Sequence, residues 1–465
     1  MKRRDFLKSS LIGAAVAGLA PTLAQRVAPQ ALAQENASSS RPRWFKGNLH
    51  SHSHWSDGQD LPEVVVDAYK RNGYDFFSLT DHNILHQQRL RFDGFAMNYA
   101  PSDMAPFKDE NSFWKRIAPQ YAWPNLVEEH LQVAKNRFGE DSVRMIETKD
   151  GKYVRMKTEE ELRAQFAEPG KFLLIPGFEM TAPFIHVNLI NVEQDFYMND
   201  PSMKDLIVKL YDHACEFYAD ARRPYLFTVN HPLWQYYNIQ PSYLFSRPGI
   251  RHFELLNNDT SYKIIPEAWT PELLWDIVNA YRACNDQPLL FATGTDDSHG
   301  IVRQDYVAFH SWMHVLADAL EVESLFDAMN RGRSYVSTGL SFQEISFDGK
   351  TLAVKLDPTL EGQYRIEFYG VKKDYDQTVK YVETTDGTRE IPTHTVECWS
   401  PEISKVLDAT DRLEGSYTLK SDDLFVRAKA YRVGAGNVSH GATTAPTLLA
   451  ADAAWTQPYR QGDVF

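Results

Sequence analysis

Residues 46–58 read Lys46-Gly-Asn-Leu-His50-Ser-His52-Ser-His54-Trp-Ser-Asp57-Gly58, which places three histidines and one aspartate within eight residues. If this segment is extended, the histidines project from one face, because side chains alternate along a strand. Two imidazoles on one face can bind the same metal ion. The stretch therefore predicts a metal site at the end of a strand. A solvated, histidine-rich turn is the alternative.

Short apolar segments and amphipathic segments alternate over residues 44–345. The pattern predicts helices over 62–72, 202–219, 270–284 and 320–331, and strands over 45–50, 75–80, 171–176, 186–192, 225–229, 250–257 and 288–293. Polar residues directly follow several of these strands. In an α/β barrel such residues gather at the face that carries the active site. The alternation therefore predicts an α/β fold with one such face.

Two regions depart from this alternation. Residues 84–170 are rich in aromatic side chains and are expected to form an insertion or lid, with helices near 125–138 and 158–167. From residue 346 to 465 the helical pattern stops, and strands are expected over 352–356, 364–371, 417–420 and 424–433. We therefore expect a small antiparallel β domain with a tail at 346–465.

The first 33 residues have the pattern of a twin-arginine signal peptide. A basic segment, 2–8, is followed by an apolar run over 11–24 and by a small-x-small site at 31–33. Residues 34–43 are polar and predict a linker. We expect a periplasmic or secreted protein that uses the twin-arginine export machinery and has no stable membrane association. A cytosolic basic start is the alternative.

Composition excludes several classes of function. The chain of 465 residues is 43% hydrophobic and 13% aromatic, and its formal net charge is -13. An acidic chain is a poor candidate for nucleic-acid binding through a basic surface. Three cysteines, Cys215, Cys284 and Cys398, form no CxxC motif and are expected to be buried free thiols, with one disulfide as the alternative.

Nine nitrogen and oxygen ligands can be collected from the predicted strand ends. They are His50, His52, Asp57, His82, Glu179, His186, His231, Asp297 and His299. A mixed set of imidazoles and carboxylates suits two or three divalent ions, with Zn, Mn and Fe all compatible. We therefore expect a metal centre built from most of the strands of the α/β region.

The spacing of these residues resembles the PHP family, the polymerase and histidinol phosphatase domain. The matching motifs occur in family order, as His50-x-His52 with Ser56-Asp57-Gly58, Thr80-Asp81-His82, Gly177-Phe-Glu179 with His186, Asn230-His231-Pro232, and Asp297-x-His299. The resemblance implies a distorted (β/α)7 barrel over 44–345, a trinuclear metal site and hydrolytic chemistry, usually on phosphoesters. The export signal, insertion and C-terminal domain are most similar to the carbaryl-hydrolase-like branch, which implies carbamate cleavage as an alternative.

The resemblance also assigns the ligands to three metal positions. It implies one ion on His50, His52, Glu179 and Asp297, a second on Asp57, His82 and His299, and a third on Glu179, His186 and His231. A hydroxide bridging the metals would then attack phosphorus or a carbonyl carbon of a small, anionic ester.

Other catalytic groups are less sharply defined by the sequence. His54, Asp81 and Asp296 lie beside ligands and are candidates for the general acid or for groups that orient a ligand. Arg303, Arg331 and Arg333 follow the last motif and are candidates for a phosphate clamp. The sequence thus predicts an exported metal-dependent phosphoesterase. A metallohydrolase of carbamate, carboxylic ester or amide bonds and a non-catalytic metal-binding protein are the alternatives.

Overall fold

The structure is a computed structural model, and residues 41–465 form one compact unit within it. It describes residues 41–86, 113–117, 128–149, 151–182, 185–198, 203–221, 223–233, 239–257, 270–302, 308–384, 394–435 and 452–465. The predicted signal peptide and most of the predicted linker lie outside these residues. Among the described helices, none is both long and apolar enough to cross a membrane.

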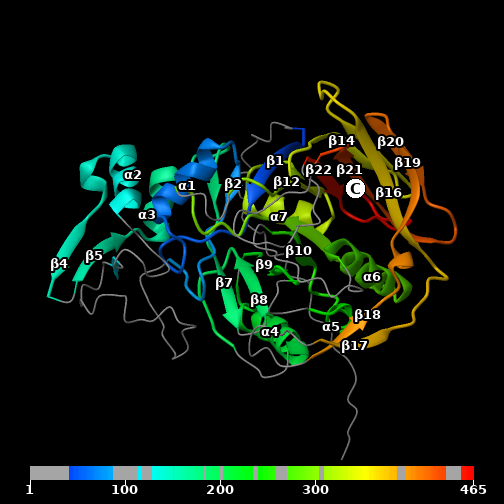
Figure 1. The fold of residues 1–465 in the computed structure, drawn as a ribbon, viewed down its shortest axis with the longest axis horizontal. Coiled ribbons are helices and arrows are strands. Elements are labelled where there is room, and N and C mark those ends of the chain that lie inside the picture. Colours follow the sequence, from blue (N-terminus) through cyan, green and yellow to red (C-terminus); the bar gives the residue numbers. More distant parts are fainter. Residues whose placement is uncertain are drawn as a thin grey trace, which may run out of the picture. The chain divides into compact units, whose positions relative to one another are not determined.

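Two large sheets carry the ligand-bearing strands (Figure 1). The nine-stranded sheet has the order β19 (Lys405–Thr410), β16 (Tyr364–Lys372), β21 (Asp423–Arg432), β22 (Ala453–Thr456), β13 (Ser334–Ser337), β12 (Trp312–Ala317), β1 (Arg43–Asn48), β2 (Phe76–Phe77) and β6 (Leu173–Leu174). The five-stranded sheet has the order β11 (Phe291–Gly294), β10 (His252–Leu256), β9 (Leu226–Val229), β8 (Ile185–Ile190) and β7 (Gly177–Ala182). The fold is therefore mixed α/β, as the sequence predicts.

The directions of the strands bring the predicted ligands to one edge. Strands β1, β2 and β6 are parallel, and so are β9, β10 and β11. The carboxyl ends of parallel strands meet at the same edge of a sheet. Two isolated bridges join the two sheets at that edge, between Ser51 and Ser298 and between His82 and Glu179. The two halves of the site are therefore connected through the backbone.

The predicted (β/α)7 barrel is confirmed only as a mixed α/β fold, since the described strands form no closed barrel. Strands β2 and β6 have two residues each, which leaves little backbone to continue a ladder. Strands β7 and β8 form an antiparallel hairpin, and β12 pairs antiparallel to β1. These pairings divide the ligand-bearing strands between two sheets.

The ends of several helices follow from residues that start or stop a helix. Helix α1 (Pro62–Arg71) begins with a proline in its first turn and ends before Gly73, whose φ of 75° suits a residue without Cβ. Helix α6 (Pro271–Cys284) starts at Thr270, whose side chain accepts a hydrogen bond from the Leu273 amide. The other helices are α4 (Met203–Phe217), α5 (Pro241–Phe245) and α7 (Val322–Asn330). The observed ends of α1, α4, α6 and α7 lie close to the predicted ones.

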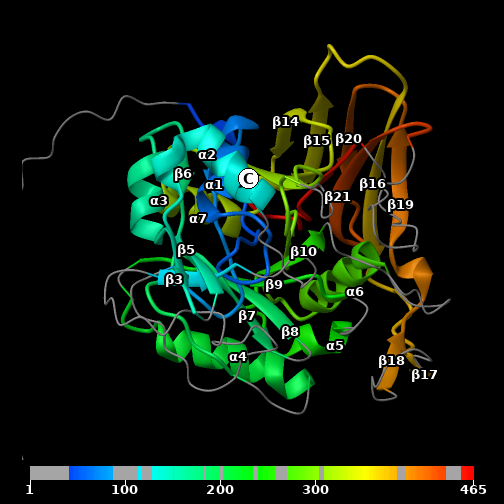
Figure 2. The same ribbon diagram turned by 60° about the vertical axis from the view of Figure 1, so that its left-hand side comes forward.

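The described part of the insertion contains helices α2 (Glu128–Phe138) and α3 (Glu159–Phe166), as predicted. It also contains an antiparallel sheet of β3 (Phe113–Arg116), β5 (Gly151–Met156) and β4 (Met145–Thr148). Figure 2 shows α2, α3 and β5 of the insertion near α1. Trp55 of the histidine-rich loop packs in one apolar cluster with residues of α2 and β5. Trp55 Nε1 also donates to the carbonyl of Lys157. The insertion is therefore packed directly on the loop that holds His52 and Asp57.

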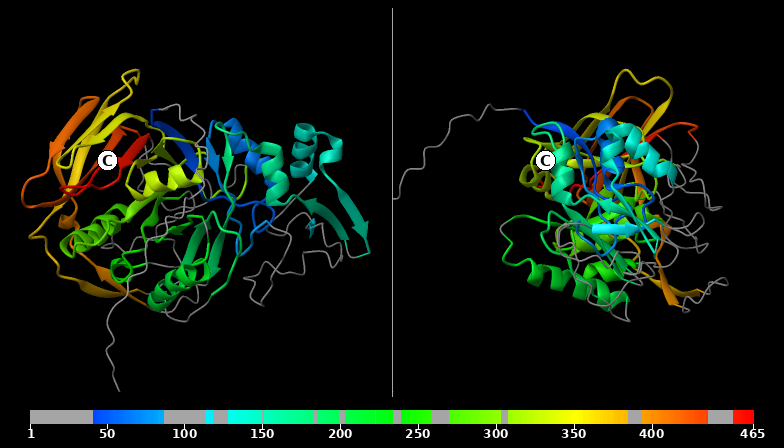
Figure 3. Two further views of the ribbon diagram at one scale, coloured as in Figure 1. Left: turned by 180° about the vertical axis from the view of Figure 1, so that it is seen from behind. Right: turned by 90° about the vertical axis from the view of Figure 1, so that its left-hand side faces the viewer.

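The predicted antiparallel strands after residue 346 are present. Strands β14 (Phe342–Phe347), β15 (Thr351–Leu356) and β20 (Glu414–Thr418) form a sheet that shares an apolar core with β16 and β21. Strands β17 (Lys380–Thr384) and β18 (His394–Cys398) form a hairpin. Figure 3 shows β16 and β21 beside α6, and β22 pairs with both β21 and β13. The nine-stranded sheet thus continues across the predicted domain boundary.

Candidate metal centre

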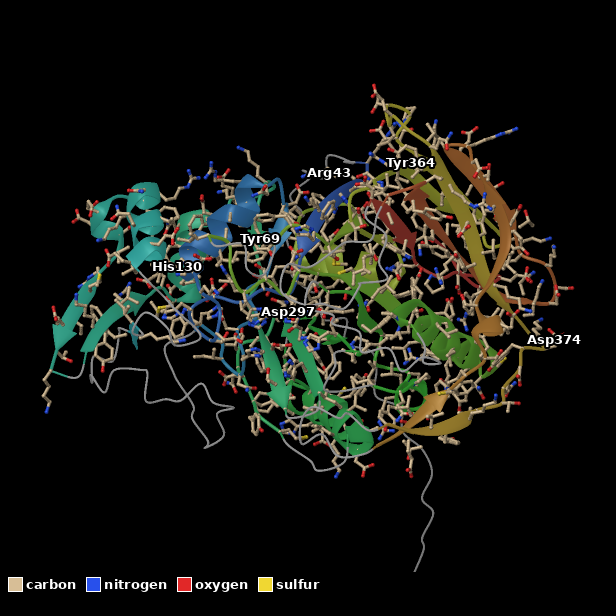
Figure 4. All side chains as sticks on the ribbon, in the orientation of Figure 1. Arg43, Tyr69, His130, Asp297, Tyr364 and Asp374 are labelled. Atoms are coloured by element: carbon tan, nitrogen blue, oxygen red, sulfur yellow. The ribbon has the colours of Figure 1, made fainter. Side chains whose placement is uncertain are left out.

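All nine predicted ligands lie in one cluster at the edge where the two sheets meet. Eight are buried, and His82 is partly exposed. Their nitrogen and oxygen atoms form four overlapping groups, each within 4.8 Å, which are His52–Asp57–His82–His299, His50–Glu179–His231, His50–His52–Asp297 and His82–Glu179–His186. The site labelled by Asp297 in Figure 4 therefore contains every nitrogen and oxygen ligand that the sequence proposed.

Glu179, on β7, is the residue shared most widely within the cluster. Its Oε1 lies 3.0 Å from His186 Nδ1, 3.3 Å from His231 Nε2 and 3.3 Å from His50 Nε2. Its Oε2 lies 2.7 Å from His82 Nδ1. One carboxylate with its two oxygens directed at different histidines has the geometry needed to bridge two cations.

Asp297, after β11, contacts the first histidine pair. Its Oδ1 lies 2.8 Å from His52 Nε2 and 3.2 Å from His50 Nε2. Its φ of 49° is in the left-handed region, which aspartate adopts more readily than most residues. Backbone strain of this kind, about 1–3 kcal/mol, is typical of functional sites.

Asp57 holds the other side of the cluster. Its Oδ2 lies 3.2 Å from His299 Nε2, and its Oδ1 lies 3.5 Å from His82 Nε2. The His52 ring stacks on the His299 ring at a centroid distance of 4.3 Å. These side chains come from the loop after β1, the loop after β2 and the loop after β11.

The groups differ from the assignment that the resemblance implies in three respects. His52 joins the group of Asp57, His82 and His299, His82 joins Glu179 and His186, and His231 groups with His50 rather than with His186. Each histidine offers few coordinating atoms, so neighbouring positions share ligands. All nine predicted residues therefore lie in the cluster, but their division among metal positions differs in part from the one that the resemblance implies.

The chemistry of these donors fits divalent cations. Two imidazole nitrogens, His50 Nε2 and His52 Nε2, face each other at 3.2 Å. The nearest partners of the buried oxygens Glu179 Oε2 and Asp297 Oδ1 are also ligand imidazoles, His82 Nδ1 at 2.7 Å and His52 Nε2 at 2.8 Å. Carboxylate oxygens and imidazole nitrogens that converge on one another in this way can all be turned toward a shared ion. Converging lone pairs with too few donors are the expected state of a site that binds cations.

Electrostatics within the cluster point the same way. Burial alone would raise the pKa of Glu179, but His186, His50 and His82 outweigh it and hold that pKa well below its usual range. Burial alone would lower the pKa of His82, but Asp57 and Glu179 outweigh it and raise that pKa well above its usual value. The carboxylates thus stabilise positive charge at the positions where an ion would lie.

Asp81 orients the histidine-rich loop rather than supplying a proton. It accepts hydrogen bonds from both the backbone amide and hydroxyl of Ser53 and of Ser56, and it lies 2.6 Å from His86 Nε2. Burial would raise its pKa, but His86 outweighs this effect and the pKa is strongly lowered. Ser56 Oγ in turn lies 3.4 Å from His52 Nδ1. An ionised, fully hydrogen-bonded carboxylate is a poor general acid.

The turn of this loop requires a glycine. A Cβ on Gly58 would lie 2.6 Å from the backbone of His52 and Ser53. Asp57 is the preceding residue, and the close approach brings its carboxylate to His82 and His299.

Among the residues that the structure describes, no hydrogen bond or ion pair joins the side chain of Asp296 or His54 to a predicted ligand. Asp296 accepts from Tyr69 Oη, from Asn48 Nδ2 and from backbone amides at 309–311. Burial raises its pKa, yet all its acceptor capacity is used for structure. His54 Nδ1 lies 3.3 Å from the Gly58 carbonyl, and burial and Lys115 hold its pKa well below its usual value. The geometry gives neither residue a place as the general acid.

Arg331 and Arg333, two of the three arginines predicted for a phosphate clamp, are not brought to the cluster. Arg331 is 61% exposed and pairs with Asp327. The Arg333 carbonyl accepts a hydrogen bond from the Leu316 amide. Leu316 precedes Ala317, which pairs with Arg43 at the start of β1. The histidines follow the opposite end of β1. Arg303 lies outside the described residues.

Several residues that contact the ligands were not predicted. Asn230 Nδ2 donates to Glu179 Oε1 at 2.7 Å, and Thr181 Oγ1 contacts His82 Nδ1. Glu254, on β10, lies 2.7 Å from His50 Nδ1. The available signal was a polar side chain inside an apolar, strand-like segment, which is a weak signal without knowledge of the neighbouring strands.

Comparisons with known proteins add little to this geometry. No family model matches the chain, and no curated protein matches it. The chain is similar to a crystal structure of a two-domain protein from Bacteroides vulgatus ATCC 8482 containing a predicted PHP-like metal-dependent phosphoesterase. The identity is 15%, the TM-score is 0.36, and the alignment covers 90% of this chain and 95% of that chain. A likeness at this TM-score supports no conclusion, so the cluster itself defines the class, a protein with a candidate multinuclear metal site.

Proposed function

We propose that the chain is an exported, metal-dependent hydrolase of the PHP type that cleaves phosphoesters. The observation that carries the proposal is the buried convergence of nine imidazole and carboxylate side chains. Six loops or strands, spread over about 250 residues of the sequence, supply them. Burying this many ionisable groups is costly unless they are paired or hold cations.

The ligand groups suggest three neighbouring positions for two or three ions of Zn, Mn or Fe. His50, His52, His231, Glu179 and Asp297 would hold the first, His52, Asp57, His82 and His299 the second, and His82, Glu179 and His186 the third. Such ions supply Lewis acidity and a water whose pKa falls to about 7. Glu179 and Asp297 stay ionised through the histidines around them, and Asn230 holds Glu179 in place.

The protein residues otherwise act by orientation. Asp81 and Ser56 hold the loop of His52 and Asp57, and the insertion packs over the same loop. The site chemistry then requires no serine or cysteine nucleophile. A small molecule with an ester group is the proposed substrate.

A second candidate is a hydrolase of carbamate, carboxylic ester or amide bonds with the same ligands. It is favoured by the positions of Arg331 and Arg333, which lie at the other end of β1 and cannot clamp a phosphate there. A phosphoryl group carries more charge than a carbamate and is usually held by arginine.

The experiment that tests the proposal uses the purified chain without residues 1–33, stripped with EDTA and reloaded with Mn, Zn or Fe(II). The substrates are p-nitrophenyl phosphate, a bis-p-nitrophenyl phosphate diester, and the acetate and N-methylcarbamate esters of p-nitrophenol. We expect metal-dependent hydrolysis of a phosphate, which Glu179→Ala abolishes. Hydrolysis of only the acetate or carbamate would replace the first candidate by the second. Tight metal binding without hydrolysis of any ester would support the non-catalytic alternative.

We further propose that the chain is periplasmic or secreted and that it uses the twin-arginine route. The support is the basic, apolar and small-residue order of residues 2–33.

A further inference from the structure

Glu254 is a buried carboxylate at the cluster that belongs to none of the four ligand groups. Its residue is 1% exposed, and it lies on β10 between β9 and β11. The neighbouring strands contribute His231, after β9, and Asp297, after β11. The position of Glu254 in the sheet therefore corresponds to that of a ligand, although its side chain has other partners.

Both oxygens of Glu254 are occupied by protein groups. Oε1 accepts from Thr295 Oγ1 at 2.7 Å and lies 2.7 Å from His50 Nδ1. Oε2 accepts from the His231 amide and from Asn257 Nδ2, each at 2.8 Å. These contacts leave Glu254 directed at ligands rather than at an ion.

Through these contacts one carboxylate reaches three ligands that follow three different strands, β1, β9 and β11. His50 and His231 are contacted directly. Asn257 Nδ2 lies 3.2 Å from Asp297 Oδ2 and so extends the contact to the third ligand. His50, His231 and Asp297 belong to the two groups that share His50, and none of them belongs to the group around Asp57.

The contact with His50 has a chemical consequence. When Nδ1–H donates to Glu254, the lone pair of His50 lies on Nε2, which faces Glu179 Oε1 at 3.3 Å and Asp297 Oδ1 at 3.2 Å. A carboxylate behind a ligand imidazole fixes its tautomer and increases its basicity. The ring is thus presented to an ion in the form that binds it.

We propose that Glu254 is a positioning residue that sets the affinity of the metal position around His50, while the position around Asp57 is independent of it. The inference rests on the proposed metal binding but not on the identity of the substrate. Replacement by glutamine keeps the size of the side chain and removes its charge. It also replaces one carboxylate oxygen by an NH2 group, which then faces two hydrogen-bond donors. The tautomer of His50 is then no longer fixed by a carboxylate.

The test is a metal-binding titration of Glu254→Gln against a chromophoric chelator, with Zn and with Mn, followed by measurement of bound metal. We expect one ion to bind about 10–100-fold more weakly than in the unchanged chain, and the remaining ion or ions to bind as before. Equal affinities for every ion would overturn the proposal, and so would an equal loss at every position.

Glu63→Gln is the matched control. Glu63 is also a buried carboxylate, on α1, but it pairs with Lys157 of the insertion at 3.6 Å and not with a ligand. This variant is expected to bind metal as the unchanged chain does. Thr295→Val is a milder change, since it removes one donor to Glu254 and touches no ligand. Its effect on the same ion is expected to be smaller.

Thermal unfolding separates positioning from a general loss of structure. A positioning role predicts that Glu254→Gln reduces the rise in Tm caused by metal, in addition to any fall in the Tm of the EDTA-treated protein that the lost hydrogen bonds cause. A lower Tm without metal and an unchanged rise with metal would contradict it. If the unchanged chain binds no metal, the proposed function fails, whereas metal binding by both proteins with equal affinity removes only the role of Glu254.

Discussion

Arg427 and Asp276 form a buried, doubly hydrogen-bonded ion pair between β21 and α6. Nε donates to Oδ1 at 2.8 Å, and Nη2 donates to Oδ2 at 2.7 Å. The guanidinium also lies over the rings of Trp275 and Tyr369, at 5.1 and 4.7 Å from their centroids. Because α6 connects β10 to β11, this pair joins the C-terminal strands to the part of the chain that carries Glu254 and Asp297.

Arg427→Met is expected to lower the free energy of unfolding by about 3–5 kcal/mol, because it leaves the Asp276 carboxylate buried without its cation. Urea unfolding of the metal-loaded protein measures the change. Arg365→Met is the matched control, since Arg365 is an exposed arginine paired with Glu367 and Asp411, and a much smaller loss is expected. Adding Asp276→Leu to Arg427→Met should restore much of the stability. A double variant no more stable than the single one would contradict this account.

The same interface predicts a dependence of stability on pH. Burial would raise the pKa of Glu272, but Lys429 and Arg427 outweigh it and lower that pKa in the folded state. A lowered folded pKa contributes stability above the unfolded value, about 4.3, and this contribution is lost as pH falls through the folded pKa. Glu272→Gln is therefore expected to unfold with a shallower pH dependence below about pH 4.3. Parallel pH profiles of unfolding for the two proteins would argue against it.

Removal of a ligand is expected to abolish both activity and normal metal content. Glu179→Ala, His50→Ala and Asp297→Ala each remove an atom shared between neighbours in the cluster. Since loss of an outer partner alone costs about 10–100-fold, loss of a ligand should reduce kcat/KM by more than that. Metal analysis and assay of each variant provide the check, with Glu63→Gln as the control. Normal turnover by any of the three would remove that residue from the site.

Asp81→Asn is expected to weaken metal binding and activity by about 10–100-fold without removing a ligand. The amide cannot accept every hydrogen bond that Ser53, Ser56 and His86 make to the carboxylate. Higher metal concentration should recover part of the activity, as expected when a loop is misplaced but its ligands remain. If Asp81 were the general acid, metal affinity would be unchanged and only kcat would fall.

Deletion of residues 2–8 is expected to stop export of the folded chain. Cell fractionation with an antibody against the chain measures its distribution. The control is a chain whose apolar run and cleavage site are intact and in which Asp5 alone is replaced by Asn. Recovery of the deletion variant from the periplasm would disprove the twin-arginine interpretation.

The members of the cluster could be predicted from the sequence because most of them lie next to a recognisable apolar segment. His50, His82, His231 and Asp297 follow segments that read as strands, and parallel neighbours bring such ends together. The other members of the cluster were predicted from the order of the motifs along the chain. Local patterns therefore sufficed for membership of the cluster.

Contacts between distant segments were beyond these patterns. Glu254 acts on His50 across the sheets, and nothing in the spacing of either residue records that contact. Strand β12 pairs antiparallel to β1, and β22 returns to pair with β13, so the expected barrel does not close. Arg331 lies close in sequence to the last motif, but β12 and α7 carry the chain to the other end of the sheet before it. For Arg331, closeness to the last motif in the sequence therefore does not mean closeness to the cluster in space.

The bridge between Ser51 and Ser298 has a consequence for how the protein acquires its ions. It joins the first and last ligand-bearing loops, so the centre cannot assemble until almost 300 residues have been synthesised and folded together. The first loop of a nascent chain offers His50, His52 and Asp57 before the later residues exist, and any abundant transition metal can occupy such a local set. The cell compartment in which folding is completed, and the metals available there at that time, would thus determine which ions the mature protein contains.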